Sequence, residues 1–134
     1  SRYGNNSFSD TLTLLEACDD VATANWGAGW RMPTDTEMAE LRTNCTMSWT
    51  TQNGVNGRLF TGQNGNSIFL PAAGYYNNIS LIGAGSSGGY CSSSLYTGCP
   101  NSAWNIYFYS GGCSVNRSHR CSGLSVRPVC SPQY

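Results

Sequence analysis

The chain has 134 residues, enough for one domain with a hydrophobic core but too few for two. It has 16 glycines, only 10% charged residues and no lysine, a composition that favours a loop-rich domain with strands over a helical bundle. All seven acidic residues precede position 41, and the later arginines are too scattered for a nucleic-acid-binding surface. We expect no nucleic-acid partner, and no apolar run reaches the roughly 20 residues that would cross a membrane.

Two helices are predicted in the first third. The first is expected over residues 14–25, where apolar residues recur at the spacing of one helix face. Those residues are Leu14, Leu15, Cys18, Val21 and Ala22. The second is predicted after Pro33, because Thr34 and Glu37 form a capping box and Met38 begins an apolar face.

Turn dipeptides are frequent after the second helix: Asn53-Gly54, Asn56-Gly57 and Asn64-Gly65. Strands are predicted over 58–61 and 67–73, with the last of these dipeptides turning a hairpin between them. Residues 77–89 are rich in Gly and Ser and are predicted to be a flexible loop. Within them, 83–88 matches G-x-G-x-x-G, but no helix pattern follows, so a dinucleotide site is not expected.

Three more strands are predicted near the C-terminus, over 103–110, 114–118 and 123–130. The first alternates between two faces. One face is expected in the core and carries Trp104, Ile106 and Phe108. The other carries Asn105, Tyr107 and Tyr109, where a purely solvated strand would more often show Lys, Glu or Thr.

Metal and cofactor chemistry find little support in the sequence. There are seven cysteines but no C-x-x-C pair, and the sole histidine is His119, so we expect no zinc site, no other metal and no cofactor. An odd number of cysteines leaves at least one thiol unpaired within the chain, and the pairing of the others stays open.

Several ordered segments carry a family resemblance over about residues 16–130. They are ANWG (24–27), GWRMPT (29–34), NCT (44–46), WTTQNGVNG (49–57), NSIFLPAAGY (66–75), SSS (92–94), AW (103–104) and GLSVRPV (123–129). Together they resemble the Fibrobacter succinogenes major paralogous domain, found in Bacteroidetes proteins and their phages. The resemblance implies an α+β, C-type-lectin-like fold, in which two helices pack on a twisted, mostly antiparallel sheet with long loops. It implies no particular ligand, because a fold does not fix a function.

The segment from Tyr90 to Ser122 suggests a diversified surface. In relatives varied by a diversity-generating retroelement, AAC codons are randomised at their adenines, which can yield Tyr, Ser, Cys, Gly, Arg, His and others but never Lys, Glu, Gln, Met or Trp. This segment has no Lys, Glu, Gln or Met, and its only Trp is Trp104, which belongs to the family framework. A further departure is Cys91, where the family usually has Trp. The inferred variable, ligand-binding positions are Tyr96, Gly98, Cys99, Ser102, Tyr107, Tyr109, Cys113, Asn116, Arg117, Ser118, His119, Cys121 and Ser122.

These residue types suit recognition, since Tyr gives rigid contact area and Ser, Gly and Asn give adaptable hydrogen bonds, as in antibody paratopes. We interpret 1–134 as one domain, with a scaffold over 1–75, a variable ligand-binding region over 90–122 and a closing strand over 123–130. The expected function is non-enzymatic binding of a protein or glycan on a cell surface. The expected location is extracellular, in a virion protein or a bacterial surface adhesin, although the first ten residues show no signal peptide.

Two alternatives belong to other classes. A calcium-dependent lectin with a fixed glycan ligand would need carboxylates, and no acidic residue follows Glu40. An oxidase similar to formylglycine-generating enzymes would need a copper-binding cysteine pair, for which Cys113 and Cys121 are available. The resemblance to C-type lectins also implies one candidate disulfide, Cys18–Cys130.

Overall fold

The computed structural model describes residues 13–99, 101–119 and 122–130. Strands make up 50% of it and helices 14%. The helices are α1 (Val21–Trp26) and α2 (Asp35–Asn44), and neither is long and apolar enough to cross a membrane. The strands are β1 (Trp30–Arg31), β2 (Thr46–Gln52), β3 (Val55–Thr61), β4 (Ser67–Pro71), β5 (Tyr75–Asn77), β6 (Ser80–Ile82), β7 (Ser87–Leu95), β8 (Ser102–Tyr109), β9 (Gly112–His119) and β10 (Val129–Cys130).

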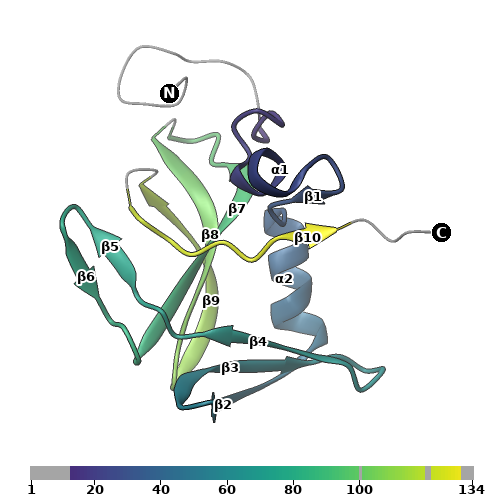
Figure 1. Ribbon diagram of the computed structural model, residues 1–134, viewed down its shortest axis with the longest axis vertical. Helices are drawn as coiled ribbons and strands as arrows, with labels where there is room; N and C mark the ends of the chain where they lie inside the picture. The colour runs from purple at the N-terminus through teal and green to yellow at the C-terminus, as the bar shows by residue number, and fades with distance from the viewer. Residues whose placement is uncertain (1–12, 100, 120–121, 131–134) are drawn as a thin grey trace.

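The expected C-type-lectin-like α+β fold, with two helices packed on one sheet, is wrong. The chain is mostly β, and its antiparallel strands form four small sheets: β1–β10, β2–β3–β4, β5–β6 and β7–β8–β9 (Figure 1). Helix α2 packs against β7, β8 and β9, whereas α1 packs beside β1. Tight turns with left-handed residues, such as Asn53, Gly54 and Gly65, close the hairpins after short strands. Because most strands pair only with their neighbours in the sequence, they form several small sheets and not one large sheet.

The helix predicted over residues 14–25 is wrong in its first half. Leu14 instead forms an antiparallel bridge with Ser94, so the chain runs extended beside β7. The carboxylate of Asp20, which is only 4% exposed, accepts the N–H groups of Ala22 (2.9 Å) and Met32 (2.9 Å). Because a buried carboxylate needs such donors, Asp20 caps the helix and α1 starts at the next residue.

The second predicted helix is confirmed as α2, together with its capping box. Thr34 Oγ1 accepts the N–H of Glu37 at 3.3 Å, and Glu37 Oε2 accepts the N–H of Thr34 at 3.1 Å. Arg31 donates to both oxygens of Glu37, at 2.5 and 2.9 Å. Met38 is 3% exposed and joins the core, as its place in the pattern predicts.

The hairpin predicted between 58–61 and 67–73 is confirmed as β3 and β4, with Gly65 at a φ of 85° in the turn. The flexible loop predicted over 77–89 is wrong. That segment folds into the β5–β6 hairpin and then begins β7. Asn78 takes a φ of 56° in the tight turn, which Asn tolerates better than most residues.

The core lies where α2, the β2–β3–β4 sheet and the β7–β8–β9 sheet meet. Its buried members are Met38, Phe60, Leu70, Ala72, Tyr90, Ile106 and Phe108. The ring of Phe108 meets Phe60 edge to face at 6.4 Å and stacks on Tyr90 at 6.0 Å. Of the predicted core face of 103–110, Ile106 and Phe108 are therefore confirmed, whereas Trp104 is only partly buried and lies outside the core. Gly88 lies directly over this ring, since a Cβ there would come within 2.4 Å of Phe108.

The closing strand predicted over 123–130 is wrong as a continuous element. Gly123 bridges to Tyr76, Ser125 bridges to Tyr90, and the β10 residues pair with β1. In Figure 1 this segment, in yellow, passes across the front of β7 and β8. It ties separate sheets together by a few backbone bonds to each.

The cysteines that the structure describes are all free thiols. Cys18 and Cys130, the candidate disulfide, are both exposed and unbonded, so that prediction is wrong. Burial raises the pKa of the Cys91 thiol to about 11 and also raises the pKa of Cys113. These two thiols are poor nucleophiles at neutral pH.

Candidate ligand-binding face

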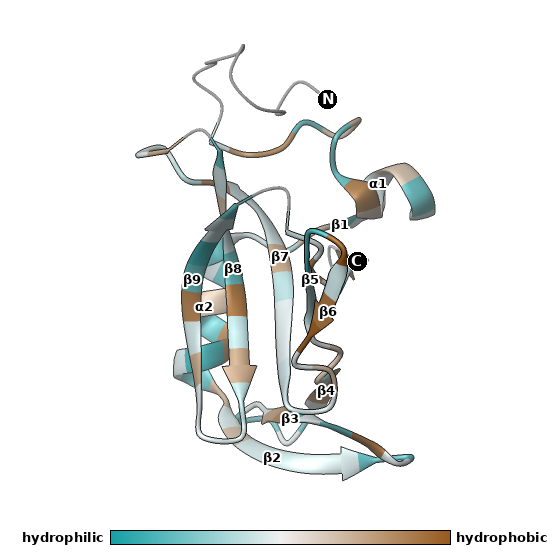
Figure 2. Cartoon of the chain, turned by 90° about the vertical axis from the view of Figure 1, so that its left-hand side faces the viewer, coloured by the Kyte–Doolittle hydropathy of each residue, from teal (hydrophilic) through white to brown (hydrophobic). Residues whose placement is uncertain are grey.

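The face of β8 and β9 that points away from α2 carries polar and aromatic side chains, and Figure 2 looks onto it with α2 behind. Paired residues of antiparallel strands share a face, so the register places Asn105 with Asn116 and Tyr107 with Ser114. We call this set the outer face: Asn105, Tyr107, Tyr109, Ser114, Asn116 and Ser118. Core residues such as Ile106 alternate with it and point inward.

A hollow of about 280 Å³ lies on the outer face. Its lining residues are Tyr75, Asn105, Tyr107, Asn116, Arg117, Ser118, Ser122 and Leu124. Tyr75 comes from β5, and its ring meets Tyr107 edge to face at 6.4 Å. Tyr109 continues the aromatic row 6.5 Å beyond Tyr107. Three tyrosines from two sheets thus form a continuous aromatic surface beside the hollow.

Short hydrogen bonds fix the polar part of the outer face. Asn105 Nδ2 donates to Ser118 Oγ at 2.8 Å, and Asn116 Nδ2 donates to Ser114 Oγ at 3.0 Å. Asn105 is 2% exposed, so its amide supports the floor of the hollow. Among the described residues no carboxylate lines the hollow, and Arg117 is the only charged residue that does. The surface therefore offers amides, hydroxyls and aromatic rings, with little net charge.

Five of the predicted binding residues line this hollow: Tyr107, Asn116, Arg117, Ser118 and Ser122. Tyr109 lies beside it and is 50% exposed. The structure therefore brings together six of the thirteen predicted positions from two strands and the segment after β9. These residues lie together because β8 and β9 pair. The sequence alone indicates which residues share a face of one strand, but not which residues of two strands lie opposite each other.

A second group of predicted residues lies elsewhere. Trp104 pairs with Arg117, and its ring packs edge to face on Tyr96 at 5.4 Å, while the Arg117 guanidinium lies 4.5 Å over the Tyr96 ring. Gly98 lies under the same ring, since a Cβ there would come within 2.8 Å of it. Cys99 belongs to the turn between β7 and β8, which an N–H bond from Ser102 closes. Tyr96, Gly98 and Cys99 lie at this end of the sheet and do not line the hollow, whereas Arg117 contacts Tyr96 and also lines the hollow.

The remaining predicted positions belong to neither of these two groups. Cys113 pairs with Phe108 and packs against the core, so its thiol is not on the outer face. His119 is exposed at the end of β9, opposite Ser102, which is 8% exposed. Cys121 lies outside the described residues. The burial of Cys113 gives no support to a copper-binding pair.

Sequence reasoning missed three residues of the hollow: Tyr75, Asn105 and Leu124. Asn105 carries a usable signal, because it is two residues from Tyr107 on the same strand face. Tyr75 and Leu124 carry none, since each reaches the hollow from a segment far from β8 in the sequence.

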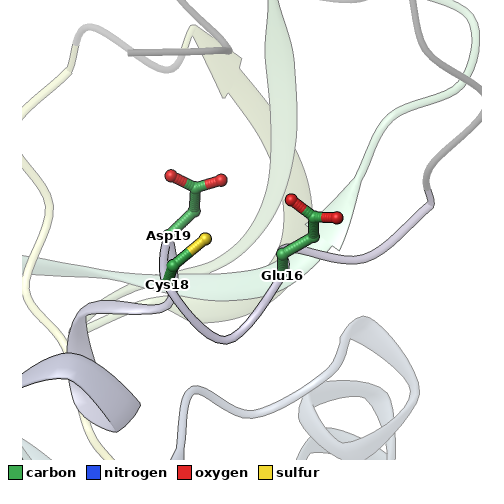
Figure 3. A group of neighbouring side chains, drawn as sticks. All are labelled: Glu16, Cys18 and Asp19. Atoms are coloured by element: carbon green, nitrogen blue, oxygen red, sulfur yellow. The ribbon is translucent and has the colours of Figure 1, made fainter.

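A separate cluster offers ligands for a metal ion. The ligating atoms of Glu16, Cys18 and Asp19 lie within 4.8 Å of one another, and the three side chains point to the same side of the turn before α1 (Figure 3). Asp19 Oδ2 is buried without a hydrogen-bond partner among the described residues, whereas Cys18 is exposed. The expectation of no metal rests on histidine and C-x-x-C spacing, which do not detect such a cluster. It stays a prediction.

No protein-family model matches the chain, and no curated protein and no solved structure is similar to it.

Proposed function

We propose that this chain is a non-enzymatic binding domain that recognises a macromolecule, a protein or a glycan on a cell surface, through the outer face and its hollow. One observation carries the proposal: three tyrosines adjoin a concave, nearly uncharged surface on the side of the sheet opposite the core. Tyr rings give large contact area at low entropic cost, and the neighbouring amides and hydroxyls supply hydrogen bonds.

We also propose that the predicted variable positions, several of which lie on the outer face or line its hollow, are diversified by a retroelement. Tyr107, Asn116, Ser118 and Ser122 fit the codon pattern and line the hollow. The intervening residues, such as Ile106, pack inward and tolerate little change. The resemblance to the Fibrobacter domain supports this at the level of sequence segments, and an extracellular virion or bacterial surface protein is the carrier that we propose.

A glycan-binding protein with one fixed ligand is the second candidate. The hydroxyls and amides that line the hollow favour it, because sugars are recognised by such groups beside aromatic rings. Sequencing the locus in its source population separates the two. Substitutions concentrated at residues 96–122 and confined to codons derived from AAC support diversification, whereas near-identity across residues 90–122 supports a fixed ligand and contradicts it.

The binding surface itself is tested with glycan and cell-surface-protein arrays. We expect the double variant Tyr107→Ala and Tyr109→Ala to lose at least tenfold in affinity, since buried tyrosines at interfaces cost about 2 kcal/mol or more when truncated. The matched control is Tyr76→Ala, because Tyr76 and Tyr109 are each 50% exposed, but of these two only Tyr109 has a ring contact with Tyr107, which lines the hollow. Equal affinity of the folded double variant and the wild type would contradict the proposal.

A further inference from the structure

A second cavity, of about 410 Å³, opens where the first turn of α2 meets the end of β7 and the start of β8. Its lining residues are Thr13, Leu14, Thr34, Asp35, Thr36, Ser94, Leu95, Thr97 and Trp104. Trp104 alternates with the outer-face residues along β8, so this cavity lies on the α2 side of the sheet. It shares no lining residue with the hollow.

The lining combines one carboxylate, one indole and the hydroxyls of four threonines and a serine. Ser94 Oγ donates to Asp35 Oδ1 at 2.8 Å and accepts the Asp35 N–H at 3.0 Å, which fixes the carboxylate in place. Ser94 is 5% exposed, so this anchor is rigid. Among the described residues no hydrogen bond engages Asp35 Oδ2, which leaves one carboxylate oxygen to accept from a ligand.

The Trp104 indole is held by a neighbouring aromatic ring. Tyr96 meets Trp104 edge to face at 5.4 Å, with an angle of 86° between the rings. The Arg117 guanidinium lies over the Tyr96 ring, 4.5 Å from the ring centre. An indole held by a neighbouring ring and a fixed hydrogen-bond acceptor line the same cavity, as in many small-molecule sites, and the volume lies within the usual range of about 300–1,000 Å³.

The charges around this cavity indicate which class of ligand it can bind. The helix start is a poor anion site here, because Asp35 adds a negative charge and the N–H groups of Asp35 and Glu37 already donate to Ser94 and Thr34. A cation would gain from Asp35 and the indole, but one carboxylate stands among five hydroxyl side chains in this lining, which favours a ligand rich in hydroxyl groups. Hydroxyl groups of an uncharged ligand satisfy both the carboxylate and the threonines, since hydrogen bonds to a charged acceptor are the strong ones.

We propose that this cavity binds a neutral saccharide, whose C–H face lies on the Trp104 indole and whose hydroxyls donate to Asp35. The proposal is independent of the ligand recognised by the outer face. It makes the domain a protein with two recognition sites on opposite sides of one sheet.

Titration of the ¹⁵N-labelled protein with glucose, galactose, mannose and N-acetylglucosamine tests it, with the Trp104 indole N–H signal as the readout. The Trp104→Phe variant identifies that signal among those of the four tryptophans. We expect at least one of the neutral sugars to shift it saturably, and glucuronate to bind at least tenfold more weakly. No saturable shift with any of the four sugars, or binding of tetramethylammonium alone, would overturn the proposal.

Asp35→Asn separates ligand binding from folding, because Asn keeps the shape and can keep the bond from Ser94. We expect this variant to bind the neutral sugar at least tenfold more weakly and to lose the discrimination against glucuronate. The matched control is Glu40→Gln, an exposed change on the same helix, which should leave the titration unchanged. Unaltered sugar binding by folded Asp35→Asn would also overturn the proposal.

Discussion

At the scale of single residues, Cys91 shows how the closing segment protects a thiol. Burial raises its pKa to about 11, against a hydrogen bond from the Leu124 backbone that lowers it. At pH 8 about one thiol in a thousand is then ionised. We expect iodoacetamide to modify the exposed Cys18 and Cys130 far faster than Cys91, as followed by peptide mass spectrometry. Comparable rates at all three sites in the folded protein would contradict this.

Gly88 is a residue whose side chain must be absent. A Cβ there would lie 2.4 Å from the ring of Phe108, which is fully buried and has no free space to move into. We expect Gly88→Ala to lower the free energy of unfolding by about 1–3 kcal/mol, the usual cost of overpacking a core. Urea denaturation measures it. Gly29→Ala, where a Cβ meets nothing within 4 Å, is the control and should change stability far less.

At the scale of elements, the start of α2 gives stability that depends on pH. The bond from Arg31 lowers the pKa of Glu37, more than burial raises it. Because the pKa of Glu37 is lower in the folded than in the unfolded protein, the ionised carboxylate stabilises the fold. This stability is fully present above the unfolded pKa, near 4.5, and is lost as the pH falls through the folded pKa. The pair is exposed, with side chains 40% and 36% accessible, so we expect at most about 1 kcal/mol from it.

Glu37→Gln tests this contribution, because Gln can keep the capping bond but not the ion pair. We expect the variant to be less stable than the wild type at pH 7, with a smaller difference at pH 3, in denaturant titrations at both values. Glu40→Gln, on the exposed side of α2, should show no such convergence. A difference between Glu37→Gln and wild type that is the same at both pH values would refute the ion-pair explanation.

The elements also show which predictions a sequence supports. The capping box of α2 and the turn at Gly65 were predictable, because each depends on residues within a few positions. The start of α1 was not, because it is set by Asp20 reaching Met32, twelve residues away. The β5–β6 hairpin was not predictable either, for another reason. Its residues have the composition of a loop, and the turn at Asn78 that defines the hairpin is not marked by a turn dipeptide.

At the scale of the whole molecule, the candidate site was predicted in part. The alternation of side chains along β8 correctly predicts that Tyr107 lies on the face opposite the core. It cannot show that Tyr75 crosses from another sheet to meet Tyr107, nor that Cys113 falls on the core side of β9. Both facts depend on strand register, which pairs residues distant in sequence. The twelve predicted positions that the structure describes therefore divide among the hollow and its edge, the end of the sheet and the core.

The distribution of carboxylates over the whole molecule leads to a last prediction. The acidic residues lie in the first 40 positions, and among the described residues none lines the hollow. Calcium needs several oxygen ligands, usually including carboxylates, so an outer-face ligand should bind without it. We expect a ligand found on the arrays to show the same Kd in excess EDTA and in excess calcium chloride, measured by surface plasmon resonance.

A chelator effect alone would not locate the ion, because Glu16, Cys18 and Asp19 form a separate cluster that metal could occupy. Cys18→Ser and Asp19→Asn together remove that cluster without touching the hollow. If calcium strengthens binding tenfold or more and does so equally in this double variant, the ion acts at the outer face and our assignment of an uncharged, metal-independent surface fails. If the double variant abolishes the effect, the ion acts through the turn before α1, and the outer face still binds its ligand by tyrosines, amides and hydroxyls.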